Sequence, residues 1–164
     1  MGCEECGFEY NLAKAPDAAS SIATGVAEFA ALLCDGRAAV RTRREPTQWS
    51  PLEYGCHLRD VLLVQRERVL TARRRERPPF EPMGRDERVD HDGYAEQQPE
   101  AVARQLTVAA QLFINVLGRL SPDDWDRSLM YNYPRPAERS LRWVAVHTVH
   151  EVSHHLLDAR RQLP

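Results

Sequence analysis

The sequence lacks the features of a membrane or nucleic-acid-binding protein. It has no run of about 18 apolar residues that could span a bilayer, and its first residues lack the basic and then apolar regions of a signal peptide. The numbers of basic and acidic residues are nearly equal, with 22 Lys and Arg residues and 24 Asp and Glu residues. We therefore expect a cytoplasmic protein that binds neither nucleic acid nor a membrane.

Cysteine is also scarce, with four residues in the chain. The reducing cytoplasm disfavours disulfides, so we expect no disulfide framework. Cys34 and Cys56 lie among apolar neighbours in helical segments and are predicted to be core residues. Cys3-Glu4-Glu5-Cys6-Gly7 has the form of half a zinc site, but no second CxxC follows it. Three roles remain open for this CxxC: redox exchange, a zinc site completed by other side chains or a second subunit, and an exposed arm without function.

The length of 164 residues and the 43% hydrophobic content fit one independently folding domain. We expect an N-terminal arm with the CxxC over residues 1–15 and a single domain over residues 16–164. No stretch alternates with period two over the length of a strand, whereas several segments follow helical spacing. The predicted fold class is therefore all-α, a four-helix bundle.

Four helices are predicted from apolar spacing and end signals. The first begins at Asp17 or Ser20 and ends near Gly36. The second begins at Ser50, because Ser50-Pro51-Leu52-Glu53 has the pattern of a capping box with Pro at the first helical position. The remaining two begin near Pro99 and at Leu141, and end near Leu120 and Leu163.

Two connections separate these helices. Residues 76–96 form a long link between the second and third helices that is rich in charge, Pro and Gly, and we interpret it as a candidate wall of a functional site. Residues 127–139 contain Pro134 and Pro136, which prevent a continuous helix, and we expect a loop there.

Histidines are concentrated on the predicted last helix. His147, His150, His154 and Asp158 share one face, and a His pair at positions i and i+4 can bind one metal ion. His57, in the second turn of the second helix, is the natural third ligand. His147 competes with the other two histidines for a ligand position.

Two further histidines are not expected to bind the ion. His155 points about 100° away from His154 on the helical wheel, and His91 lies in the polar connection. The alternative is that the histidines are polar surface or core residues held by carboxylates. Glu151, Asp158 and Asp60 are the carboxylates that we expect to orient ligating histidines.

A resemblance supports the metal interpretation. The bundle pattern, one His early in the second helix and the stretch His150-Glu151-Val152-Ser153-His154-His155-Leu156-Leu157-Asp158 resemble the DinB-like superfamily over essentially the whole chain. That superfamily includes thiol-dependent S-transferases and mycothiol-dependent maleylpyruvate isomerases, and its bundle holds a metal through three histidines. The resemblance implies His57, His150 and His154 as the metal ligands.

Three protein ligands would leave open positions on a divalent ion, for which zinc and nickel are the leading candidates. We expect a metal-dependent thiol S-transferase or hydrolase that acts on a small molecule with a metal-activated water or a low-molecular-weight thiol such as mycothiol. A non-catalytic metal-binding or stress-response bundle is the alternative. Leftover apolar helix faces are compatible with a homodimer. Arginines near the site in sequence could hold acidic groups: Arg59, Arg135, Arg139 and Arg142.

Overall fold

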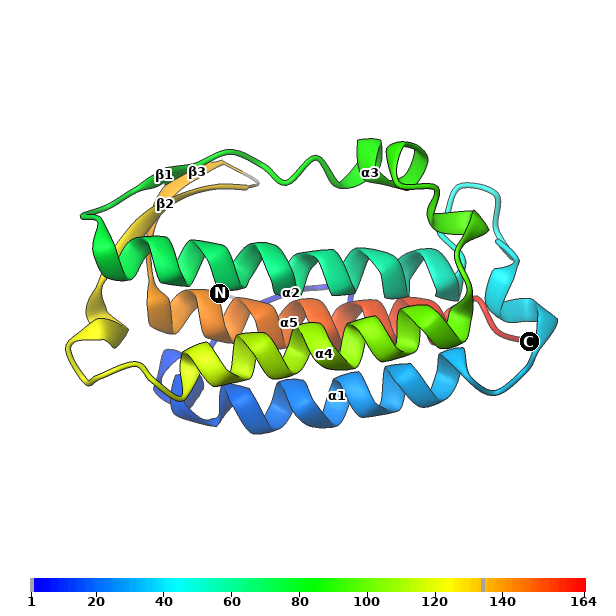
Figure 1. Ribbon diagram of the computed structural model, residues 1–164, viewed down its shortest axis with the longest axis horizontal. Helices are drawn as coiled ribbons and strands as arrows, with labels where there is room; N and C mark the ends of the chain where they lie inside the picture. The colour runs from blue at the N-terminus through cyan, green and yellow to red at the C-terminus, as the bar shows by residue number, and fades with distance from the viewer. Residues whose placement is uncertain (1, 134) are drawn as a thin grey trace.

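The computed structural model describes residues 2–133 and 135–164. Four long helices form its main body (Figure 1): α1 (Ala18–Leu33), α2 (Pro51–Arg74), α4 (Pro99–Leu117) and α5 (Leu141–Arg161). Both α1 and α2 pack against α4 and α5, so α1 and α2 lie at opposite corners of the bundle. The predicted four-helix bundle is confirmed.

Helix α2 begins where the sequence predicts. Ser50 is its N-cap, and the Ser50 hydroxyl accepts a hydrogen bond from the Glu53 backbone N–H at 3.2 Å. The Glu53 carboxylate accepts one in return from the Ser50 backbone N–H at 2.7 Å. This capping box satisfies two N–H groups that the first helical turn would otherwise leave unpaired. It fixes the start of the helix that carries His57.

The other helices largely follow their predicted bounds. Asp17 is the N-cap residue of α1, although its side chain makes no capping hydrogen bond. At the start of α5, the Ser140 hydroxyl accepts from the Trp143 backbone N–H at 3.2 Å. Cys56 is buried as predicted, but Cys34 is exposed, because it stands at the C-cap of α1 where the chain leaves the core. The prediction that Cys34 is a core residue is wrong.

A small sheet corrects the all-α prediction. The antiparallel strands β2 (Ser128–Asn132) and β3 (Pro136–Ser140) occupy the expected loop, and β1 (Pro79–Phe80) pairs with β2 in parallel. Side chains alternate along β2, so that Leu129 and Tyr131 are buried. Five residues give too short an alternation to stand out in sequence, but pairing with β3 and burial against the bundle stabilise it.

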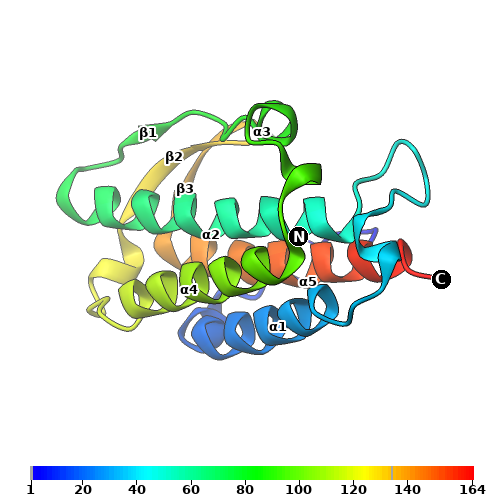
Figure 2. The ribbon, with the colours of Figure 1, turned by 45° about the vertical axis from the view of Figure 1, so that its right-hand side comes forward.

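The long connection is structured as well. It contains β1, the short helix α3 (Arg85–His91) and a 3-10 turn at Tyr94–Glu96. Figures 1 and 2 show the sheet and α3 above α2, on the side away from α1. This connection and the sheet therefore form walls around one side of the bundle.

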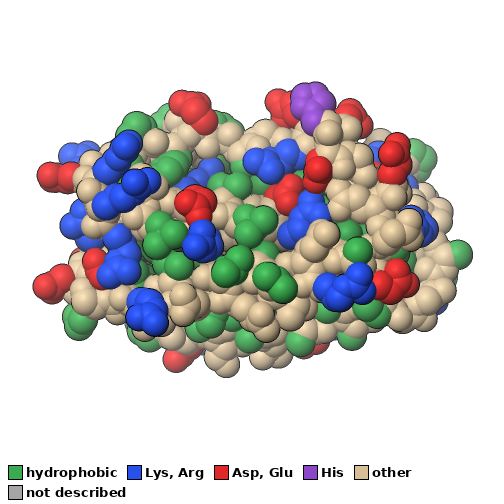
Figure 3. Space-filling model, in the orientation of Figure 1, with side chains coloured by type: hydrophobic (Ala, Val, Ile, Leu, Met, Phe, Trp, Pro, Cys, Tyr) green, Lys and Arg blue, Asp and Glu red, His purple; other side chains and the backbone are tan. Residues whose placement is uncertain are grey.

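The core fills the space between the four long helices. Ile22, Phe29, Leu58, Leu106 and Phe113 are fully buried there, and burying each such side chain contributes about 1.5–3 kcal/mol. Acidic and basic side chains are interspersed over the face drawn in Figure 3. Within the described residues, no helix has both the length and the apolar character needed to cross a bilayer.

Candidate metal centre

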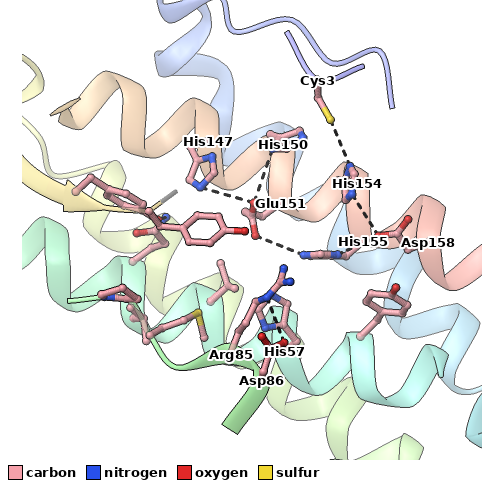
Figure 4. A pocket seen from close by; sticks show the side chains of 18 of the residues that line it. Cys3, His57, Arg85, Asp86, His147, His150, Glu151, His154, His155 and Asp158 are labelled. Atoms are coloured by element: carbon pink, nitrogen blue, oxygen red, sulfur yellow. Dashed lines mark hydrogen bonds and ion pairs between the residues drawn. The ribbon is translucent and has the colours of Figure 1, made fainter. Parts of the chain in front are cut away.

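Helix α5 presents candidate metal ligands on two different faces. Glu151 and His155, one helical turn apart, point toward His57 on α2, whereas His154 points toward Cys3 of the N-terminal arm (Figure 4). Successive residues on a helix are rotated by about 100°. His154 therefore groups with the thiols of the arm and His155 with His57, although both histidines also lie near Asp158.

The first cluster joins α2 to α5. His57, Glu151 and His155 each offer a ligand atom, and the three atoms lie within 4.8 Å of one another. His155 Nε2 is 3.4 Å from Glu151 Oε2, and the His57 and His155 rings meet edge to face at 4.9 Å. Two ligands bonded to one zinc ion in tetrahedral geometry would be about 3.4 Å apart at bond lengths of about 2.1 Å. The Glu151–His155 separation matches that spacing.

His155 is oriented by a second carboxylate. Its Nδ1 lies 3.3 Å from Asp158 Oδ2, which leaves Nε2 directed toward Glu151. Ligating histidines commonly donate their other N–H to such a carboxylate. Burial alone would lower the pKa of His155, but hydrogen bonds to Asp158 and Glu151 outweigh it and raise the pKa to about 9. Without an ion, His155 is thus a cation between two carboxylates.

Glu151 stays ionised in this setting. Burial alone would raise its pKa, yet the hydrogen bond with His155 and the nearby imidazoles hold the pKa well below its usual range. A buried carboxylate that remains charged is available as an anionic ligand for a cation. Glu151 therefore supplies the negative charge of the cluster.

His57 completes the cluster as a neutral imidazole. It is buried, and mainly this burial, with the charge of His155, lowers its pKa to about 3. Its Nδ1 is buried and has no hydrogen-bond partner among the described residues. A buried nitrogen without a hydrogen-bond partner lowers the stability of the fold by about 1–3 kcal/mol. A metal ion bound to that nitrogen would remove this penalty. These three residues fit a divalent metal.

A cavity of about 1020 Å³ lies beside the cluster. Arginines stack on aromatic rings along its wall: Arg68 over Tyr131 at 4.5 Å, Arg139 over Trp143 at 4.8 Å, and Arg85 over Trp49 at 5.8 Å. The residues that line it come from α2, α5, the sheet, the long connection and the arm. The prediction that the connection forms a wall of the site agrees with this lining.

The predicted ligands divide between clusters. His57 lies with Glu151 and His155, whereas His150 and His154 group with Cys3 and Cys6. No group of ligand atoms within 4.8 Å joins His57 to His150 or His154 in the part of the chain that the structure describes.

The competitor His147 lies beside both clusters, whereas the loop histidine His91 lies apart from them. His147 groups with His150 and Glu151, and its Nδ1 lies 2.8 Å from the Tyr10 hydroxyl. Mainly burial lowers the pKa of His147 to about 4. His91 is exposed at the end of α3.

Some of the supporting residues predicted from the sequence lie away from the cluster. Asp158 orients histidines as expected, but Asp60 instead pairs with Arg59 and accepts a hydrogen bond from the Tyr94 hydroxyl at 2.6 Å. Arg139 lines the cavity, as expected of an arginine near the site. Arg59 faces α4 through its contact with Gln105.

The other two predicted arginines do not line the cavity within the described residues. Arg142 pairs with Asp126, and Arg135 is exposed.

Glu151 and His155 were missed as candidate ligands, although the sequence carries a relevant pattern. Thr148, Val152 and Ala159 are buried at spacings of four and seven residues. His155 continues that stripe three residues after Val152, and Glu151 lies one turn before His155. Apolar periodicity along α5 therefore indicates that His155, not His154, faces the bundle interior.

The fold and this cluster define a helical bundle with a candidate histidine–carboxylate metal centre. A family model described as the DinB superfamily matches residues 23–159, and the chain belongs to that superfamily. The predicted resemblance is confirmed.

One solved structure is similar over most of both chains. It is described as "YfiT from Bacillus subtilis is a probable metal-dependent hydrolase with an unusual four-helix bundle topology", with a TM-score of 0.83, 12% identity, and coverage of 94% of this chain and 88% of that chain. At this identity the likeness shows the fold alone. A search of curated protein sequences gave no match.

Proposed function

We propose that this protein is a divalent-metal-dependent enzyme whose reactive ion is held by His57, Glu151 and His155. One observation carries the proposal: two histidines and one ionised carboxylate converge within 4.8 Å beside a large cavity. No fourth His, Cys, Asp or Glu joins this group among the described residues. Three protein ligands are the composition of a catalytic zinc site with an open position, and two histidines with one glutamate are one known set.

Zinc and nickel suit this mixture of imidazole and carboxylate ligands. When bound, such an ion lowers the pKa of a coordinated water toward about 7 or holds a coordinated thiol as thiolate. The chain's own residues have separate tasks. Asp158 holds the His155 ring in its ligating orientation, and Glu151 balances part of the ion's charge.

The cavity wall supports a small anionic substrate. Arg68, Arg85 and Arg139 line it, and their guanidinium groups can bind a carboxylate or phosphate through paired hydrogen bonds. The aromatic rings beneath them offer flat apolar contacts for the remainder of the substrate. We infer that the substrate is a small molecule with an acidic group and an electrophilic carbon near the ion.

Two nucleophiles fit the same centre. Water would make the protein a hydrolase, which is the activity named as probable for the structural neighbour YfiT. A low-molecular-weight thiol such as mycothiol would make it an S-transferase, the activity class to which the sequence resemblance points. The cavity of about 1020 Å³ has room for either a water or a thiol beside the substrate.

The test is a comparison of metal-loaded proteins on one panel of acidic esters, amides and thiol-reactive electrophiles. Each substrate is assayed with and without added thiol, after reconstitution with Zn²⁺ or Ni²⁺. Wild-type protein should turn over at least one class, and Glu151→Gln and His155→Ala should reduce that turnover to background. His91→Ala is the matched control, because His91 is exposed on α3, and it should behave as wild type.

Three results would overturn the proposal. One is turnover that survives in His155→Ala. Another is a number of bound ions per chain that is the same in His57→Ala and His155→Ala as in wild type. A fully metal-loaded wild type that is inert across the panel would instead support the non-catalytic alternative.

A further inference from the structure

The N-terminal arm folds as a metal-binding knuckle before it reaches the bundle. The Cys3 backbone N–H donates to the Phe8 carbonyl at 2.9 Å, and the Gly7 N–H donates to the Cys3 carbonyl at 2.8 Å. Gly7 follows Cys6 directly and has φ of +70°, a backbone conformation that glycine adopts at little cost. This tight turn brings both thiols to the same side of the arm, facing α5.

Two histidines of α5 complete a group of four. The sulfurs of Cys3 and Cys6 and one nitrogen each of His150 and His154 all lie within 4.8 Å of one another. Cys3 Sγ is 3.7 Å from His154 Nδ1. Tetrahedral zinc with bonds of about 2.3 Å to sulfur and 2.05 Å to nitrogen separates such a pair by about 3.6 Å. The observed separation between Cys3 Sγ and His154 Nδ1 is close to that value.

Polar contacts on the far side of each ring leave the nitrogen that faces the thiols free. His150 Nδ1 lies 3.0 Å from the Tyr10 hydroxyl, while its buried Nε2 has no partner among the described residues. His154 Nε2 lies 3.4 Å from Asp158 Oδ2, so its Nδ1 can face the thiols. Outer contacts of this kind fix the tautomer and the orientation of ligating histidines.

We propose that Cys3, Cys6, His150 and His154 bind one structural Zn²⁺ ion. Two thiolates and two imidazoles from a CxxC and an HxxxH form a complete Cys₂His₂ set, which leaves no open position for substrate. This second site has different ligands from the open centre, although Asp158 lies near one histidine of each, and it does not depend on the proposed function. The two sites stand side by side on α5, since His154 belongs to one and His155 to the other.

The ion would fasten the arm over the cavity. Cys3 and Tyr10 both line that cavity, and the Tyr10 ring stacks on Trp143 with centroids 5.9 Å apart. Residues 2–10 have little core of their own, and a structural zinc ion contributes folding free energy directly to so small a unit. Zinc at this site therefore sets the position of the arm that closes one side of the open centre.

The test uses Co²⁺ in place of zinc, because tetrahedral cobalt with thiolate ligands absorbs strongly in the visible and shows thiolate-to-cobalt charge transfer in the near ultraviolet. Titration of the full-length, reduced wild type should give both bands. The double variant Cys3→Ser/Cys6→Ser should lose them and bind one ion fewer by elemental analysis. Cys34→Ser, which removes the exposed thiol outside the cluster, should keep the wild-type spectrum.

A further variant separates the two sites. His57→Ala/His155→Ala removes ligands of the open centre only, so it should keep the thiolate bands while losing the other ion. The zinc proposal would be overturned by a correctly folded wild type that shows no thiolate bands, or by bands that persist in Cys3→Ser/Cys6→Ser. A mass showing a Cys3–Cys6 disulfide in protein purified under reducing conditions would also overturn it. The wild-type spectrum alone can overturn the zinc proposal, so the test still gives an answer if a variant misfolds.

Discussion

His154 and His155 are consecutive on α5 and both lie near Asp158, but the other nitrogen of each ring faces a different partner. His154 Nδ1 lies 3.7 Å from Cys3 Sγ, and His155 Nε2 lies 3.4 Å from Glu151 Oε2. The rotation of about 100° between successive helical residues separates the two rings. One helical turn of sequence thus serves two candidate metal sites, and four predictions concern this arrangement and the surrounding fold.

The first prediction contrasts these two histidines. His155→Ala should weaken metal binding at the open centre by more than about 100-fold, since even the loss of an outer partner of a ligand typically costs about 10–100-fold. His154→Ala should leave the open centre loaded. Isothermal titration with Zn²⁺, together with activity on any substrate found, makes the comparison. The opposite result would favour the ligand set His57, His150 and His154 implied by the sequence resemblance.

The second prediction concerns Tyr10, whose hydroxyl lies 2.8 Å from His147 Nδ1 and 3.0 Å from His150 Nδ1. Tyr10→Phe leaves at least one buried imidazole nitrogen unpaired, so it should lower the free energy of unfolding by about 1–3 kcal/mol. Urea denaturation of the metal-free protein measures the change. Tyr133→Phe is the control, because Tyr133 is exposed. Equal stability of the two variants would mean that the Tyr10 contacts do not persist in solution.

The third prediction concerns the pH dependence of stability through Glu53. Burial raises its pKa, but hydrogen bonds from Arg43 and the Ser50 backbone outweigh burial and lower the pKa below its usual value. Its stabilisation is therefore complete above the unfolded-state pKa of about 4.3 and is lost as the pH falls through the folded-state pKa. Glu53→Gln should cost about 1–2 kcal/mol at neutral pH, with a smaller difference from wild type below pH 4.

Urea unfolding across a pH series checks the Glu53 prediction. Glu67→Gln is the control on the same helix, because the Glu67 side chain is largely exposed, and it should change stability little at any pH. A Glu53→Gln deficit that stays constant down to low pH would show that the carboxylate charge is not its source.

The fourth prediction tests the close approach of α1 and α5. A Cβ added at Gly25 would lie 2.5 Å from Val152 Cγ1, next to Glu151. Val152 is β-branched and cannot easily rotate away, so Gly25→Ala should destabilise the fold by about 1–3 kcal/mol through overpacking, which exceeds the gain of up to about 1 kcal/mol in helix propensity.

The matched substitution for Gly25 is Gly118→Ala at the end of α4. There the added Cβ meets its nearest neighbour, the Ile114 carbonyl oxygen, at an ordinary 3.5 Å. This variant should be neutral or slightly stabilising in thermal unfolding. A stable Gly25→Ala protein would mean that α1 and α5 are less tightly packed than the structure has them.

Local signals in the sequence specify the helical framework. The capping box at Ser50 and Glu53, Pro99 at the start of α4 and the Ser140 cap of α5 act through neighbouring residues, so they can be recognised without tertiary information. The same is true of the HxxxH and CxxC spacings, which depend only on local backbone geometry. The bundle pattern, His57 and the stretch from His150 to Asp158 were the local features that predicted a DinB-like bundle with metal-binding histidines.

The grouping of the candidate ligands depends instead on long-range packing. Local geometry permits both the His150–His154 pair and the Glu151–His155 pair, and the choice between them depends on the rotation of α5 about its axis. Burial of Val152 and its neighbours on that helix sets the rotation so that His155 faces α2. Cys3 of the CxxC likewise contacts His154, about 150 residues away in the sequence, because the arm folds back across α5. Long-range packing fixes contacts of this kind, and no local pattern specifies them.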